Sequence, residues 1–176
     1  MADLTGRLRY LRNAEAMIAV ALPVVFVAVW NKAGQPVAWS LRMGSVALVC
    51  SLLLQGALYW HLKLAVVEAG CSMPPWFPRL FTSMRRINVA MFAGYAIMLA
   101  SAAATGASRA DLGWSAALLA FAVLEHVNYY HWQLMYDTSG ALRSAWRRRG
   151  LRPAALGVDL RRARADASPG GRRPPD

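Results

Sequence analysis

Residues 14–30 read AEAMIAVALPVVFVAVW, a stretch that is apolar apart from Glu15 and Pro23. A helix that crosses the hydrocarbon core of a bilayer needs about 20 mostly apolar residues. Three further stretches of this kind follow, at residues 43–62, 87–105 and 114–134. Because backbone groups in lipid must be hydrogen-bonded within their own segment, each stretch is predicted to be a transmembrane helix. The expected fold is an all-α integral membrane protein, with four transmembrane helices packed as a bundle over residues 1–140.

The composition of the 176-residue chain agrees with this fold. Charged residues make up 16% of the chain and apolar residues 57%, whereas ordinary soluble domains contain about 25% charged residues. The net charge is nevertheless +11, because 20 Lys and Arg residues stand against 9 Asp and Glu residues. These basic residues lie between and after the apolar stretches. The composition therefore excludes both a soluble globular domain and a disordered basic protein.

The basic residues also predict how the chain is threaded. Lys32, Arg42 and Arg109 fall in the first and third connections, and the other 17 precede the first helix, follow the second or form part of the tail. Because cytoplasmic segments carry the excess of Lys and Arg, both termini are predicted to be cytoplasmic. The 18 Arg and two Lys residues, with abundant Ala, indicate a GC-rich bacterial genome. The predicted location is the plasma membrane of a bacterium, with several crossings.

Two cytoplasmic segments are candidates for contact with the membrane surface or a partner. In the second connection, residues 67–86, prolines surround Trp76 and Phe77. This cluster is expected to lie in the headgroup layer as a short interfacial segment or to dock a partner. Residues 141–167 alternate arginines with apolar residues, which predicts a basic amphipathic segment with Leu156 and Leu160 on one face. Residues 168–176, SPGGRRPPD, are expected to be disordered.

The arginines of residues 141–167 favour a membrane-surface role for that segment. A basic amphipathic helix beside a bilayer is held by anionic lipid headgroups. Nucleic acid is the alternative partner, which we do not favour because a tail after a last transmembrane helix is commonly basic. The arginines predicted to contact lipid headgroups are Arg147, Arg148, Arg149, Arg161, Arg162 and Arg164.

An internal similarity links the second and fourth apolar stretches. With the chain shifted by 70 residues, Gln55 aligns with Glu125, and the pattern aromatic-aromatic-His at residues 59–61 aligns with the same pattern at residues 129–131. This similarity predicts two tandem copies of a two-helix hairpin that insert with the same orientation. His61 and His131 would then lie at the same depth, near the cytoplasmic face.

Glu125 is the most informative polar residue, because it is expected near the middle of the fourth helix. An ionised carboxylate at that depth costs at least about 2.5 kcal/mol, so it should face the bundle interior, be protonated or have a partner. Residues 118, 121, 122, 125, 128, 129 and 132 are predicted to share its face, and His126 to turn away from that face. The candidate intramembrane polar site comprises Gln55, His61, Glu125, His126, Asn128, Tyr129 and His131.

Three functions are compatible with this set of residues. It could be a hydrogen-bond network that fixes helix packing, a proton-coupled transport site, or a metal or haem site with ligands among His61, His131 and Glu125. Neither G-x-S-x-G nor H-E-x-x-H occurs, and the connections are too short for a folded catalytic domain.

The sequence therefore favours a non-enzymatic structural, regulatory or partner-binding membrane module without a cofactor. The alternative is a small proton-coupled transporter, or a metal- or haem-binding membrane protein. A transporter with only four helices would be expected to form a homodimer.

Overall fold

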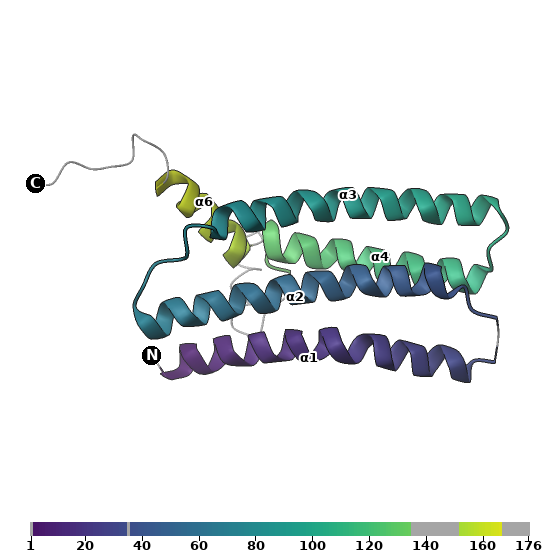
Figure 1. Ribbon diagram of the computed structural model, residues 1–176, viewed down its shortest axis with the longest axis horizontal. Helices are drawn as coiled ribbons and strands as arrows, with labels where there is room; N and C mark the ends of the chain where they lie inside the picture. The colour runs from purple at the N-terminus through teal and green to yellow at the C-terminus, as the bar shows by residue number, and fades with distance from the viewer. Residues whose placement is uncertain (1, 35, 135–151, 167–176) are drawn as a thin grey trace, which may run out of the picture. The chain divides into compact units, whose positions relative to one another are not determined.

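The computed structural model describes residues 2–34, 36–134 and 152–166. Four long helices occur in chain order, α1 (Ala2–Lys32), α2 (Trp39–Ala69), α3 (Phe77–Ala104) and α4 (Arg109–Tyr130), and a shorter helix follows, α6 (Ala155–Asp166) (Figure 1). Each of the four long helices is apolar and long enough to cross a membrane. The described ranges contain no β-strand. The predicted all-α fold with four membrane-spanning helices is thus confirmed.

The helices begin and end at different residues from those expected. α1 begins at Ala2 instead of residue 14, and α2 continues to Ala69 instead of residue 62. Hydropathy marks the length that fits the hydrocarbon core, whereas helical hydrogen bonding continues through the adjoining Leu, Arg, Glu and Lys residues, which are good helix formers. α2 ends where Gly70 adopts a left-handed conformation, with φ 63°, which is the usual C-terminal stop of a helix.

The connection between α2 and α3 is shorter than the sequence indicated. α3 begins at Phe77 rather than at residue 87, so the second half of the expected connection forms the first turns of this helix. Pro78 does not prevent this, because the first-turn N–H groups of a helix have no intrahelical partner to lose. α4 ends at Tyr130, short of residue 134. The prolines at 74 and 75 therefore lie in the short connection between α2 and α3, just before α3 begins.

The chain forms two compact units, which we describe separately. Unit 1 comprises Met1–Met73 and Asn88–Glu125, and unit 2 comprises Pro74–Ile87 and His126–Asp176. Unit 1 therefore holds α1, α2 and most of α3 and α4. Unit 2 holds the first turns of α3, the last turns of α4, and α6.

In unit 1, α2 is the central helix (Figure 1). In the most apolar stretch of each helix, the buried share is 56% for α2, 33% for α4 and 11% for both α1 and α3. Polar contacts join α2 to α1 through Trp60, whose indole Nε1 donates to Glu15 Oε1 at 2.8 Å. On the α3 side, the Tyr95 hydroxyl donates to the carbonyl oxygen of Leu41. The peripheral helices α1 and α3 consequently leave much of their surface exposed.

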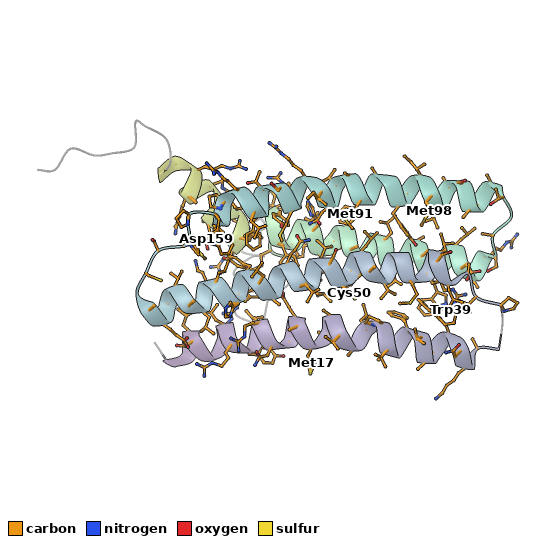
Figure 2. The ribbon with its side chains drawn as sticks, viewed as in Figure 1. Met17, Trp39, Cys50, Met91, Met98 and Asp159 are labelled. Atoms are coloured by element: carbon orange, nitrogen blue, oxygen red, sulfur yellow. The ribbon has the colours of Figure 1, made fainter. Side chains whose placement is uncertain are left out.

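The exposed surface of α1 and α3 is apolar. Met17 lies on the side of α1 away from α2 (Figure 2) and is 67% exposed. Other large apolar side chains on these helices are exposed to a similar extent, namely Val20, Val24 and Ile97. Water-soluble monomers rarely expose extended apolar patches. This surface therefore contacts the hydrocarbon of a lipid bilayer.

In unit 2, α6 packs through its apolar side. Leu156 and Leu160 are 2% and 5% exposed, so the prediction that they share one face is confirmed. The chain just before α6 pairs with the end of α4, because Ala154 N donates to His131 O at 3.2 Å and Gln133 N donates to Arg152 O at 2.8 Å. The apolar side of this basic segment is thus covered by protein. The predictions for Arg147, Arg148, Arg149 and residues 168–176 concern parts of the chain outside the described residues.

Candidate functional site

Unit 2 contains a pocket of about 900 Å³. The connection before α3, the first turns of α3 and one side of α6 line this pocket, so it combines the two segments that the sequence indicated as contact surfaces. The lining residues are Pro75, Trp76, Pro78, Arg79, Thr82, Ser83, Arg86, Ala163 and Arg164. Proteins bind small ligands in pockets of about 300–1,000 Å³, so its size suits a headgroup-sized molecule.

Helical spacing places the polar lining residues of α3 on one wall. Arg79, Thr82, Ser83 and Arg86 recur at intervals of three and four residues, which is the spacing of neighbours on one helix face. From α6, Arg164 Nη2 donates to Thr82 Oγ1 at 2.8 Å and so links the two walls. The described lining includes three arginines and no Asp or Glu. The pocket is therefore positively charged.

A cluster of rings occupies another part of unit 2. His126 is 5% exposed, and its ring centroid lies 4.8 Å from that of Tyr130 and 5.8 Å from that of His131. His126 is thus buried, and the rings that it contacts, Tyr130 and His131, are not on the face predicted around Glu125. Burial and the positive charge of Arg85 lower the pKa of His131, which favours its neutral form.

The face predicted around Glu125 is buried in part. Leu118, Ala122, Glu125 and Tyr129 are at most 7% exposed, whereas Phe121 and Trp132 are 41% and 48% exposed. The buried stripe therefore follows alternating steps of three and four residues and leaves out the two large aromatic residues. Glu125 is 7% exposed inside a membrane-spanning helix, so of the three alternatives that the sequence left open, a position inside the bundle agrees with the structure.

The other predicted site residues have different surroundings. Gln55 and Asn88 exchange two side-chain hydrogen bonds between α2 and α3, at 3.0 and 2.9 Å. Asn128 Oδ1 accepts from the backbone N of Leu134 at 2.8 Å, so this side chain supports the chain just after α4. His61 is exposed on α2. Asn88, which the sequence analysis did not select, thus takes part in the amide pair.

No group of three or more His, Cys, Asp or Glu side chains that could hold a metal ion occurs in the part of the chain that the structure describes. The assignment of His61, His131 and Glu125 as metal or haem ligands stays a prediction. Elemental analysis and a visible absorption spectrum of the purified protein would test it directly.

Sequence reasoning missed a buried ion pair in unit 1. Arg42 Nε donates to Asp111 Oδ1 at 2.6 Å, and the two side chains are only 4% and 6% exposed. Asp111 also accepts hydrogen bonds from Ala38 N at 3.1 Å and from Ser108 Oγ at 2.6 Å. This pair joins the starts of α2 and α4. Arg42, treated as part of a connection in the sequence, is in fact in the first turn of α2.

Aromatic rings surround this ion pair. The guanidinium carbon of Arg42 lies 5.1 Å from the centroid of Trp30, a distance typical of cation–π contacts. Trp30 is 1% exposed and stacks on Phe26, with 5.0 Å between ring centroids. The ring centroids of Trp39 and Trp114 lie 6.2 and 6.1 Å from that of Trp30. Figure 2 shows Trp39 at the end of the bundle where α2 begins.

One sequence signal did point to Asp111. Ser108 and Asp111 form the S-x-x-D pattern of a helix N-terminus just before an apolar stretch. In the structure Asp111 N donates to Ser108 Oγ at 3.1 Å, and α4 begins at Arg109, directly after the serine. The pattern predicts this cap, but nothing local indicates that Arg42, far away in sequence, pairs with the same carboxylate.

Comparison of the chain with protein-family models, with curated proteins and with solved structures finds no match. The fold and the exposed apolar helices define the class to which the protein belongs. It is an all-α, multi-pass membrane protein, and its described residues include four helices able to cross a bilayer.

Proposed function

We propose that this protein is a non-enzymatic module of the bacterial plasma membrane that binds anionic lipid headgroups through unit 2, with both termini in the cytoplasm. The observation that carries the proposal is the way α6 is packed. Its apolar residues Leu156 and Leu160 are buried, whereas Arg161, Arg162 and Arg164 are exposed. An interfacial helix normally inserts its apolar side into the bilayer. Here that side is covered, so the arginines are the groups left to meet headgroups.

The basic residues of unit 2 support the same proposal. Unit 2 contains the first turns of α3 and the whole of α6. Its described residues include seven arginines, namely Arg79, Arg85, Arg86, Arg152, Arg161, Arg162 and Arg164. Each basic residue next to an anionic leaflet contributes about 1 kcal/mol of attraction. The positive-inside rule places the same residues on the cytoplasmic side.

Thermal unfolding in lipid nanodiscs tests the proposed function. The 176-residue chain is placed in discs of phosphatidylcholine alone and in discs that also contain phosphatidylglycerol. We expect a higher Tm with phosphatidylglycerol at low salt, because a ligand that binds the folded state stabilises it. High salt should remove the difference by screening. Equal Tm values in both lipids at low salt would contradict the proposal.

Proton-linked transport is the second candidate, and the burial of Glu125 favours it. A carboxylic acid that is 7% exposed inside a membrane-spanning helix is a common mark of a proton pathway. If the protein transports protons, vesicles that contain it should show a proton flux under an imposed pH gradient. The Glu125→Gln variant should abolish this flux. Glu68→Gln is the control, because Glu68 is an exposed residue near the end of α2. A wild-type flux no greater than that of empty vesicles would exclude this candidate.

A further inference from the structure

We infer that the pocket between the start of α3 and α6 is a specific binding site for a phosphate ester, with Arg79, Arg86 and Arg164 as its anion-binding groups. The inference deepens the proposed function and rests on it in one respect, since it takes the source of the phosphate to be a lipid headgroup. The chemistry recognised is the same for a soluble phosphate ester. All the residues that line the pocket belong to unit 2.

The lining of the pocket concentrates positive charge. Three guanidinium groups line a single pocket of about 900 Å³ whose described lining contains no carboxylate. Like charges gathered in one place repel one another, so an anion in their midst lowers the energy of the pocket. Phosphate suits it best, because guanidinium groups bind phosphate oxygens through two parallel hydrogen bonds.

The pocket also offers hydrogen-bond donors from both α3 and α6. Thr82 and Ser83 place hydroxyl groups on the same wall as Arg79 and Arg86. Arg164 is held toward that wall, because its Nη2 donates to Thr82 Oγ1 at 2.8 Å. The pocket is also lined by the first turns of α3, where the helix dipole favours negative charge. The anion-binding groups are therefore positioned by two packed helices rather than by a loose tail.

The apolar part of the lining indicates that the phosphate belongs to a lipid. Pro75, Trp76 and Pro78 form the apolar part of the lining, and Trp76 is 46% exposed. Exposed tryptophans of membrane proteins gather at the level of the headgroups. A phospholipid can place its phosphate among the arginines and the start of its acyl chains against this apolar rim. A soluble ester could use only the polar part.

Binding measurements in maltoside micelles test the site, because such micelles contain no phosphate. The probes are glycerol phosphate and phosphatidylglycerol, with glutamate as a carboxylate probe. Arg79→Gln with Arg86→Gln should weaken phosphate binding by about 100-fold, since a charged hydrogen bond contributes on the order of a factor of ten or more. This variant keeps the hydrogen bond between Arg164 and Thr82, so α6 should remain packed.

The matched control is the chain with Arg7→Gln and Arg9→Gln, two exposed residues of α1 in unit 1. It removes the same charge from exposed residues that do not line the pocket, and we expect it to change binding by no more than about threefold, the effect of partly screened surface charge. Binding of phosphatidylglycerol alone would identify a lipid headgroup, and equal binding of glycerol phosphate would identify a soluble ester. Both outcomes support the phosphate site.

Three outcomes would overturn the site. These are no binding of either phosphate probe by the wild-type chain, equal weakening in the two double variants, or equal binding of glutamate. Failure of the site and failure of the proposed function are distinguishable. If anionic lipid still raises Tm but the two double variants bind the phosphate probes equally well, the arginines attract the lipid without a specific site. Only the pocket is then refuted. If glycerol phosphate binds through Arg79 and Arg86 but anionic lipid leaves Tm unchanged, only the proposed function is refuted.

Discussion

At the scale of single residues, the Arg42–Asp111 pair is the most consequential contact of unit 1. Both side chains are nearly fully buried, and the carboxylate accepts three hydrogen bonds from different parts of the unit. Removal of one member of a buried pair leaves the other charge uncompensated in a medium of low polarity. The pair therefore fixes how the starts of α2 and α4 are joined, although it costs desolvation energy to form.

Replacement of Asp111 by Asn should destabilise the protein by about 3–5 kcal/mol, because Arg42 would remain buried without a counter-charge. The measurement is Tm in detergent, followed by far-UV circular dichroism. The control is Glu68→Gln, which breaks the Arg9–Glu68 pair of 2.8 Å, whose side chains are 57% and 45% exposed. Exposed pairs contribute at most about 1 kcal/mol. Equal losses of Tm in the two variants would contradict the structural role given to Asp111.

At the scale of elements, α6 depends on a close approach between backbones. A Cβ atom added at Gly157 would lie 2.6 Å from the carbonyl oxygen of Tyr130, well inside van der Waals contact. Because the obstructing atom belongs to the backbone of α4, no side-chain rotation can relieve the overlap. Glycine is therefore required at this position for α6 to pack against the end of α4.

Gly157→Ala should release α6, since overpacking of this kind costs about 1–3 kcal/mol. The expected result is roughly tenfold faster trypsin cleavage after Arg161 and Arg162, because local unfolding exposes the chain to the protease. Gly113→Ala on α4 is the matched control, as no atom lies within 4 Å of its added Cβ. Unchanged cleavage in the Gly157 variant would show that α6 does not need this contact.

At the scale of the whole molecule, orientation in the membrane is the property that the proposed function needs most. Four membrane-spanning helices bring both ends of the spanning region to one side, and the distribution of basic residues predicts that this side is the cytoplasm. Two native cysteines report on it. Cys71 is exposed in the connection between α2 and α3, and Cys50 is half-buried within α2.

Maleimide labelling measures the orientation without new cysteines. In intact cells, a membrane-impermeant maleimide should leave Cys71 unlabelled, whereas it should label Cys71 in inverted membrane vesicles. Cys71→Ser is the control that assigns the signal, because Cys50 is surrounded by the helices of unit 1 and by lipid. Labelling of Cys71 from outside intact cells would reverse the predicted orientation and remove unit 2 from the cytoplasm.

The four membrane-spanning helices and the shared helical face of Leu156 and Leu160 could be predicted from the sequence alone. These features depend on local hydropathy and helical period, which neighbouring residues supply. The helix ends were predicted less well, since hydropathy reports the thickness of lipid rather than the limits of hydrogen bonding.

The packing of the folded chain specifies which distant polar groups meet. The pairing of Arg42 with Asp111 and of Gln55 with Asn88, and the pocket that Arg164 shares with Arg79 and Arg86, all join residues far apart in the chain. A polar side chain in a helix can be satisfied by any of several neighbours, and its own sequence context does not specify which helix packs beside it. Packing of α2 against its neighbours and of α6 against α3 makes that choice.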